Sequence, residues 1–225
     1  IILNSTNHTT YENVEDVIRI QSSDADTNST VTYSLSGSDA SSFQIDSNGL
    51  IKFIEAPDYE SDKTSYSFTV TANDGINTTD KTFTILVLNL NDNDPVFTSS
   101  ATFSAAENQT AIGTVTATDE DGDSITYSVS GSEIEINSST GVLTFVSAPD
   151  YETKSTYTAT VTASDGTNSA TQDITVSILD LNDNAPIILN STNHTTYENV
   201  EDVIRIQSSD ADTNSTVTYS LSGSD

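Results

Sequence analysis

Short stretches of the chain alternate between apolar and polar residues, which is the pattern of a β-strand with one buried face. Residues 31–35 (VTYSL) place Val, Tyr and Leu alternately with Thr and Ser, and residues 125–129 (ITYSV) repeat this arrangement. No stretch keeps a helical period over several turns. The pattern therefore predicts a structure made of strands.

Two apolar runs flank Gly49, and two similar runs flank Gly141, which predicts one hairpin at 43–53 and another at 134–145. Further strands are predicted at 66–72, 82–88, 157–163 and 172–179. Seven or so strands in about 95 residues, joined by turns rich in Asp, Asn, Ser and Gly, have the size of an immunoglobulin-like antiparallel sandwich. The predicted fold class is all-β, with tandem immunoglobulin-like Greek-key β-sandwiches joined end to end.

The sequence also repeats itself. Residues 1–39 recur without a change as residues 187–225, and diverged copies of the same short motifs recur at about half that spacing. The chain therefore divides into a first repeat at 1–95, a second repeat at 96–186 and the N-terminal part of a third repeat at 187–225. We interpret it as a window onto a tandem array.

Residues 187–225 supply only the first strands of the third repeat. We expect them to follow the same path as residues 1–39, with the rest of their sandwich supplied by sequence beyond this window or by a neighbouring chain, because a partial sheet leaves its edge hydrogen bonds unmade. Val217, Tyr219 and Leu221 should then be covered by the completed sheet.

Composition excludes several classes of partner and site. The chain has 34 Asp and Glu against 6 Lys and Arg, a formal net charge of −28. So acidic a surface repels nucleic acid and anionic lipid headgroups. The absence of Cys excludes a thiol nucleophile, a disulfide framework and a cysteine-based zinc site. No apolar run approaches the roughly 20 residues of a membrane span.

The carboxylates fall in loops between the predicted strands, at matching positions of each repeat. Calcium takes about six to eight oxygen ligands from carboxylates, Asn side chains and main-chain carbonyls, so tight loops rich in Asp and Asn suit it. A single acidic loop is usually only a solvated surface. The recurrence of the whole set favours calcium binding.

Five motifs recur in the repeats: Glu-Asn near the start, Asp-x-Asp after the second strand, Asp-Tyr-Glu in the middle, Asp-Gly after the sixth strand, and an Asp/Asn-rich junction, which reads DLNDNAP at 180–186. With this combination the chain resembles the cadherin repeat family over its whole length. The ordered combination is specific, whereas an Asp-x-Asp motif alone has little meaning. The resemblance implies cadherin-type sandwiches.

In that family the joint between consecutive repeats holds about three calcium ions, so the resemblance implies Ca²⁺ as the bound ion. At the first joint it assigns ligands from the first repeat, the junction and the second repeat, namely Glu12, Asp58, Glu60, Asn89, Leu90, Asn91, Asp92, Asn93, Asp119, Asp121 and Asp165. Leu90 and Asn93 would contribute main-chain oxygens. Asn89 stands where the second junction has Asp180, which should lower the affinity for one ion.

At the second joint the same resemblance assigns Glu107, Asp150, Glu152, Asp180, Leu181, Asn182, Asp183, Asn184, Asp210 and Asp212. The counterpart of Asp165 in the third repeat lies outside this sequence. Asp24, Asp26 and Asp74 would serve a joint with a repeat that precedes Ile1.

The resemblance further implies a calcium-dependent module of cell-surface adhesion or of an extracellular fibre, carried by a membrane-anchored parent. Extracellular modules bind calcium with dissociation constants on the order of 10⁻⁴ to 10⁻³ M, so these sites would fill outside the cell and stay empty in the cytosol. The expected partners are calcium, neighbouring repeats of the same or an identical chain, and a homophilic or glycan partner. The composition, poor in Lys and rich in Asn, Ser and Thr, gives the impression of a microbial or marine surface protein.

One alternative stays open: a carbohydrate-binding or spacer module of a secreted polysaccharide-active protein. The chain has no Trp for sugar stacking, and the copied repeat favours an array instead.

No enzyme is expected. Asp58 and Glu60 could mimic a glycosidase pair, but such a pair needs a cleft and a defined separation. No catalytic constellation repeats around His8 and its copy His194.

Overall fold

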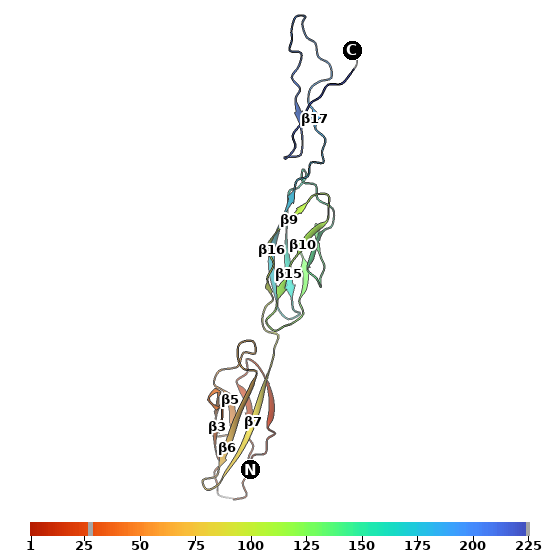
Figure 1. Cartoon of the computed structure of the whole chain (residues 1–225). Helices are drawn as coiled ribbons and strands as arrows, with labels where there is room; N and C mark the ends of the chain where they lie inside the picture. Colours follow the sequence, from red (N-terminus) through yellow and green to blue (C-terminus); the bar gives the residue numbers. More distant parts are fainter. Residues whose placement is uncertain (27–28, 224–225) are drawn as a thin grey trace. The chain divides into compact units, whose positions relative to one another are not determined.

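The computed structural model describes residues 1–26 and 29–223, which form two compact units, Ile1–Asn93 and Asp94–Asp225 (Figure 1). The first unit contains β1 (Asn7–Tyr11), β2 (Asp16–Arg19), β3 (Thr32–Ser36), β4 (Phe43–Ile45), β5 (Leu50–Phe53), β6 (Ser65–Asn73) and β7 (Thr78–Leu88). A single 3₁₀ turn, Ala40–Ser42, precedes β4, and it is the one helical element in the described part of the chain. Among the described residues, no helix is long and apolar enough to cross a membrane.

The first unit is a sandwich of two sheets, with strand orders β1-β7-β6-β3 and β2-β5-β4. Both sheets contribute to one core, in which Phe43 of β4 lies 4.5 Å from Phe68 of β6 and Phe53 of β5 lies 5.1 Å from Tyr66, measured between ring centroids. Burial of aromatic rings of this size supplies most of the stability of a small sandwich.

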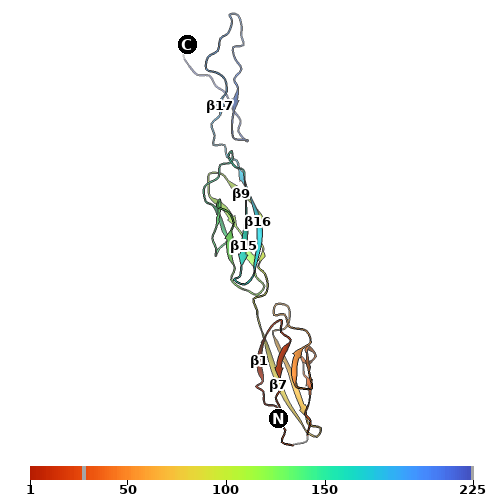
Figure 2. The same cartoon turned by 180° about the vertical axis from the view of Figure 1, so that it is seen from behind.

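The N-terminal strand differs from the prediction of a purely antiparallel sandwich. Strand β1 runs parallel to β7, with Asn7 opposite Thr84 and Tyr11 opposite Leu88 (Figure 2). The chain passes from β1 to β2 in the opposite sheet, so no hairpin forces β1 to run antiparallel to its neighbour. The remaining strand pairs of the first unit are antiparallel.

The second unit repeats this arrangement. Its strands are β8 (Val96–Phe97), β9 (Thr102–Ala106), β10 (Ala111–Thr114), β11 (Ala117–Thr118), β12 (Thr126–Val129), β13 (Ile134–Ile136), β14 (Val142–Phe145), β15 (Thr156–Ser164), β16 (Ser169–Leu179), β17 (Ile187–Ile188) and β18 (Ser208–Ser209). The main sheets have the orders β12-β15-β16-β9 and β10-β14-β13, and β9 runs parallel to β16. Leu143, Val161, Ile174 and Val176 form the centre of its core.

The strands predicted from alternation are confirmed. Residues 31–35 and 125–129 overlap β3 and β12 to within one residue at each end, and both glycine hairpins form, as β4–β5 and β13–β14. The long strands extend a few residues beyond the predicted ranges because Thr and Ser continue the pleat where the apolar alternation stops.

Gly141 closes the second hairpin in a conformation that other residues avoid. Its φ is +69°, and a Cβ atom there would lie 2.2 Å from the carbonyl oxygen of Val115. Replacing Gly141 with Ala is therefore expected to lower the free energy of unfolding of the second unit by about 2 to 4 kcal/mol, measured by urea denaturation. Gly122→Ala is the matched control, because its φ is +79° and nothing lies within 4 Å of an added Cβ. Equal losses for the two variants would contradict this reading of the hairpin.

Residues 187–223 reproduce part of the structure of their identical counterpart. Ile188 pairs with Ser208 as Ile2 pairs with Ser22, in both cases antiparallel. The main-chain N–H of Leu189 donates to Gln207 over 2.8 Å, and the corresponding bond from Leu3 to Gln21 has the same length. The local ladder at the start of the repeat therefore forms in both copies.

The outer strands of the third copy do not form. Tyr219 and Leu221 are 58% and 100% exposed, and Val217 is half-buried, so this chain alone does not cover the three side chains. Their cover by strands from outside this chain stays a prediction. No described residue corresponds to β6 or β7, against which residues 1–39 pack in the first repeat. Ile2 is 7% exposed in the first copy, whereas Ile188 is 63% exposed.

Candidate metal centre

A buried glutamate follows the first strand of each repeat. Glu12 is 1% exposed, and both of its carboxylate oxygens accept main-chain hydrogen bonds. Oε2 accepts from the N–H of Tyr59 over 2.6 Å, and Oε1 accepts from the N–H of Leu90 over 2.7 Å. Glu12 thus fastens both the Asp-Tyr-Glu loop and the junction to the end of β1.

Glu107 repeats this geometry in the second unit. It is 2% exposed, and it accepts from the N–H of Tyr151 over 2.8 Å and from the N–H of Leu181 over 2.7 Å. A buried carboxylate is tolerated because charge-assisted hydrogen bonds replace its hydration. The Glu-Asn motif of the sequence therefore marks a structural tie as well as a candidate ligand.

The asparagine that follows each buried glutamate has a left-handed backbone. The φ angles of Asn13 and Asn108 are 60° and 62°. The side-chain amide of Asn108 donates to Oδ2 of Asp183 over 2.5 Å, and the amide of Asn13 donates to Oδ2 of Asp92. Each asparagine thus holds the aspartate of its own junction.

The first residue of each Asp-Tyr-Glu motif caps its own turn. Asp58 accepts from the hydroxyl of Ser61 over 2.8 Å and from the N–H of Glu60 over 3.1 Å. These bonds lower the pKa of Asp58, with the Ser61 hydroxyl as the largest cause. Asp150 accepts from the hydroxyl of Thr153 over 2.9 Å in the same way. The caps hold both loops in place.

Two further acidic loops meet at the other end of the first unit. Asp24 and Asp74 line one cavity of about 40 Å³. Asp24 accepts from the N–H of Asp26, and Asp74 accepts from the N–H groups of Ile76 and Asn77 over 2.7 and 2.6 Å. Main-chain donors are the largest cause that lowers the pKa of each of these two aspartates. The predicted set Asp24, Asp26 and Asp74 is thus brought to one end of the sandwich.

Carboxylate oxygens from separate motifs converge in each unit. Within each cluster, one oxygen from every residue lies within 4.8 Å of the others. The clusters contain Glu12, Glu60 and Asp92 in the first unit, and Glu107, Glu152 and Asp183, or Glu152, Asp180 and Asp212, in the second. Asp119, Asp121 and Asp123 form a further cluster in the second unit, and Asp123 is not among the ligands predicted from the sequence. Its signal in the sequence was the regular spacing, since Asp119, Asp121 and Asp123 follow one another at every second position.

The C-terminal part of the second unit contributes to this convergence. Asp212 is 4% exposed, and it accepts from the N–H of Asn184 over 3.0 Å and from its side-chain amide over 2.9 Å. The same amide donates to Glu152 over 3.1 Å. The N–H of Thr213 donates to Asp180 over 2.8 Å. The structure therefore brings most predicted ligands of the second joint together.

Other predicted ligands of the second joint make different contacts. Asp210 accepts from the N–H of Asp212 over 3.1 Å, and Asp150 is engaged in its cap with Thr153. The N–H of Leu181 donates to Glu107, which leaves the Leu181 carbonyl as the expected ligand atom.

The residues predicted at the first joint are divided between the two units. The first unit contains Glu12, Asp58, Glu60 and 89–93, and the second unit contains Asp119, Asp121 and Asp165.

The oxygens of these residues fit a hard cation. Oδ2 of Asp119, Oδ2 of Asp165 and Oδ1 of Asp180 are buried and have no hydrogen-bond partner among the described residues. Buried oxygens without partners are costly unless an ion or water satisfies them. Burial raises the pKa of Glu152, and the neighbouring charges of Glu107 and Asp212 also raise it. A donor set made only of oxygen, with like charges crowded together, matches calcium better than a softer metal.

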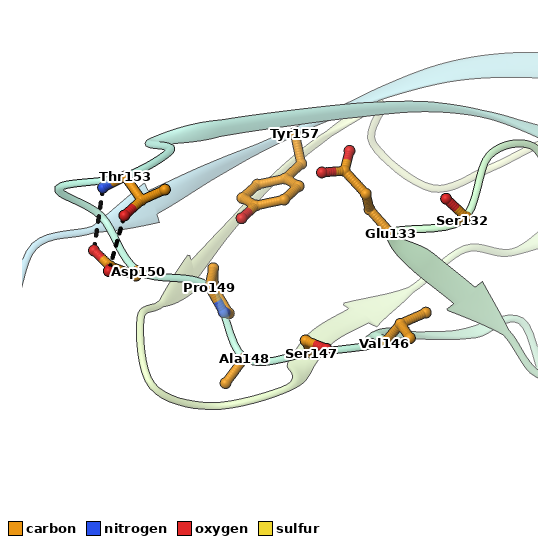
Figure 3. A pocket seen from close by; sticks show the side chains of 9 residues that line it. All are labelled: Ser132, Glu133, Val146, Ser147, Ala148, Pro149, Asp150, Thr153 and Tyr157. Atoms are coloured by element: carbon orange, nitrogen blue, oxygen red, sulfur yellow. Dashed lines mark hydrogen bonds between the residues drawn. The ribbon is translucent and has the colours of Figure 1, made fainter.

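A surface pocket tests the glycan alternative. It has a volume of about 310 Å³ in the second unit and is lined by Ser132, Glu133, Val146, Ser147, Ala148, Pro149, Asp150, Thr153 and Tyr157 (Figure 3). Tyr157 is the aromatic residue of this lining. The ammonium group of Lys154 lies 4.2 Å from the centre of the Tyr157 ring and bonds to Glu133 over 2.6 Å. Because the lysine occupies a face of the ring, the pocket offers little platform for sugar stacking.

Comparisons with known proteins agree with this geometry. The profile of the cadherin domain matches residues 9–91 and 101–179. The mouse cadherin EGF LAG seven-pass G-type receptor 1 is 35% identical over 189 residues, which are 77% of this chain and 6% of the receptor. Human protocadherin Fat 4 is 37% identical over 179 residues, which are 74% of this chain and 4% of that protein.

Solved structures give the same result. The crystal structure of mouse cadherin-23 EC22-24 matches with a TM-score of 0.76 and 25% identity, over 93% of this chain and 76% of that chain. The cis-dimer structure of protocadherin gammaB7 EC3-6 matches with a TM-score of 0.72 and 28% identity, over 95% of this chain and 61% of that chain. The two relatives above come from mouse and human. Their origin does not test the expectation that this chain comes from a microbial or marine source.

Proposed function

Because this chain belongs to the cadherin family of extracellular cell-adhesion repeats, we propose that it is a calcium-dependent adhesion or structural module whose joints are stiffened by bound calcium. Calcium binding at the joints between repeats is general in this family. The proposal for this chain adds about three ions at each complete joint, held by the ligand sets given above.

One observation carries the proposal: each unit gathers carboxylates from a strand end, the Asp-Tyr-Glu loop and the junction within 4.8 Å of one another. Two like charges 4 Å apart repel by about 4 kcal/mol at an effective dielectric constant near 20. With 34 acidic residues and only 6 basic ones in the chain, side-chain cations cannot neutralise all of these clusters. A divalent cation would relieve the repulsion and use the buried oxygens that have no partner.

The ligands come from segments on both sides of each junction. Bound calcium would supply a shared cation for these segments, so the free energy of binding would oppose bending of the junction. Without the cation, the crowded carboxylates would push the segments apart. We propose that this chain thereby acts as a rod whose stiffness depends on extracellular calcium.

The chain covers only 6% and 4% of the two relatives named above, so the activity of its whole protein is also a proposal. We infer a parent that displays this module at the cell surface and contacts neighbouring repeats or an identical chain. We also propose that the module is not an enzyme, since the paired carboxylates serve as ligands and caps. The covered ring of Tyr157 gives the carbohydrate-binding alternative no support.

Small-angle X-ray scattering of the 225-residue chain tests the rod. With calcium near 10 mM, about ten times the weakest dissociation constant typical of such modules, we expect a single, large maximum dimension. With a chelator we expect a broader distribution of distances and a smaller mean dimension, while circular dichroism still reports strands. Indistinguishable scattering profiles in the two conditions would rule out calcium-dependent stiffness.

A further inference from the structure

Asn13 and Asn108 each make two kinds of contact at one end of a sandwich. The N–H of Asn108 donates to the carbonyl of Pro149 over 3.0 Å, which ties it to the segment before the Asp-Tyr-Glu motif. Its amide donates to Oδ2 of Asp183 in the junction. In the first unit, the N–H of Asn13 donates to the carbonyl of Pro57 over 2.9 Å, and its amide donates to Asp92.

The two contacts explain the residue type. A φ near +60° is costly for most residues, and asparagine is among the few besides glycine that adopt it readily. Glycine would adopt the positive φ but has no side-chain donor. Aspartate could also adopt the positive φ, but it would place a second negative charge against the junction carboxylate. Asparagine meets both demands at once, in two repeats that differ in much of their surrounding sequence.

The junction aspartate is held at both oxygens. Oδ2 of Asp183 accepts from Asn108, and Oδ1 accepts from the side-chain amide of Asn184 over 2.9 Å. A carboxylate oxygen has a second lone pair, so these bonds leave acceptor capacity toward a cation. One Asp183 oxygen also lies within 4.8 Å of oxygens of Glu107 and Glu152.

We propose that Asn108, and Asn13 in the first repeat, are positioning residues that orient the junction aspartate for calcium. The inference rests on the proposed calcium function. The amide fixes the carboxylate before the ion arrives, so less side-chain entropy is lost on binding, as with the outer-shell partners of other metal ligands. Removing such a partner typically weakens metal affinity about 10- to 100-fold.

Asn108→Gly is the test variant, because glycine keeps the positive φ and removes only the amide. Asn199→Gly is the matched control. Asn199 lies in the same Tyr-Glu-Asn-Val sequence as Asn13, has a φ of 63°, and belongs to the third copy, where no hydrogen bond from its amide to a junction carboxylate occurs among the described residues. Both variants are made in the 225-residue chain. Calcium is titrated while NMR follows the amide signals of Leu181, Asn182 and Asp183, and the calcium-free melting temperature is recorded.

We expect the calcium dissociation constant reported by these signals to rise at least about 10-fold in Asn108→Gly and to stay within about 2-fold of the original in Asn199→Gly. The bond from Asn108 to Asp183 is exposed to solvent, unlike the part-buried bonds of Glu107, so its loss should change the calcium-free melting temperature little in either variant. This separates positioning from a merely structural role. If the affinity in Asn108→Gly is unchanged or higher, or if it falls only in step with the calcium-free melting temperature, the inference is overturned. If the unaltered chain shows no calcium-dependent shifts, the proposed function fails first.

Discussion

Chelation of calcium is expected to lower the melting temperature of the chain by about 10 °C or more. At calcium near 10 mM and dissociation constants on the order of 10⁻⁴ to 10⁻³ M, each ion stabilises the folded state by about 1.5 to 3 kcal/mol. In a domain of this size, 1 kcal/mol shifts the melting temperature by about 4 to 8 °C. Several ions at one joint therefore give a large shift, measured by differential scanning calorimetry.

Magnesium provides the control for this experiment. It demands a tighter octahedral geometry and gives up its waters reluctantly, so clusters spread over 4.8 Å should respond to it weakly. An equal rise in melting temperature with magnesium would indicate general screening of the 34 acidic side chains instead of specific sites. A melting temperature that is the same with calcium and with chelator would contradict the metal centre itself.

Replacing Glu107 with Ala is expected to produce the largest effect of any single substitution. Glu107 is 2% exposed, and its loss leaves the N–H groups of Tyr151 and Leu181 without their acceptor. Hydrogen bonds to charged groups contribute about 1.5 to 3 kcal/mol each, so the second unit should lose about 3 to 6 kcal/mol even without calcium. Urea denaturation in chelator measures this loss, and a calcium titration measures the accompanying loss of affinity.

Glu198→Ala serves as the comparison. Glu198 occupies the same position of the third copy, but it is exposed there. Its replacement should change the free energy of unfolding by less than about 0.5 kcal/mol. Should Glu107→Ala prove as mild as Glu198→Ala, the two main-chain bonds would have no structural importance.

The two identical 39-residue segments separate what local sequence determines from what depends on tertiary context. The bridge between Ile2 and Ser22 recurs between Ile188 and Ser208, because it depends only on residues within the segment. The strand at 7–11 exists only where β7 lies beside it. Alternation therefore predicts strand propensity, whereas strand formation at an edge requires the neighbouring strand.

The same distinction limits what could be predicted of the candidate metal centre. Carboxylates in motifs were found from the sequence because their spacing recurs. The tie from Glu107 to Leu181 joins residues 74 positions apart, and the contact from Asn108 to Asp183 spans 75, so no local pattern reveals either. The parallel direction of β1 was missed for the same reason, since it depends on how the chain crosses between sheets.

The lysine that covers a tyrosine ring has a consequence for recombination between repeats. Lys63 lies over Tyr66, as Lys154 lies over Tyr157, and each lysine stands two residues before a long strand. Their carboxylate partners come from different positions, Asp39 in one repeat and Glu133 in the other. Consider a chimaera in which only the loop before β4 is exchanged for the loop before β13. The carboxylate that pairs with the lysine would then come from a different position of the loop. Crossovers that keep the loop and the lysine together preserve the pair, so the repeats are exchangeable as whole modules more readily than in parts.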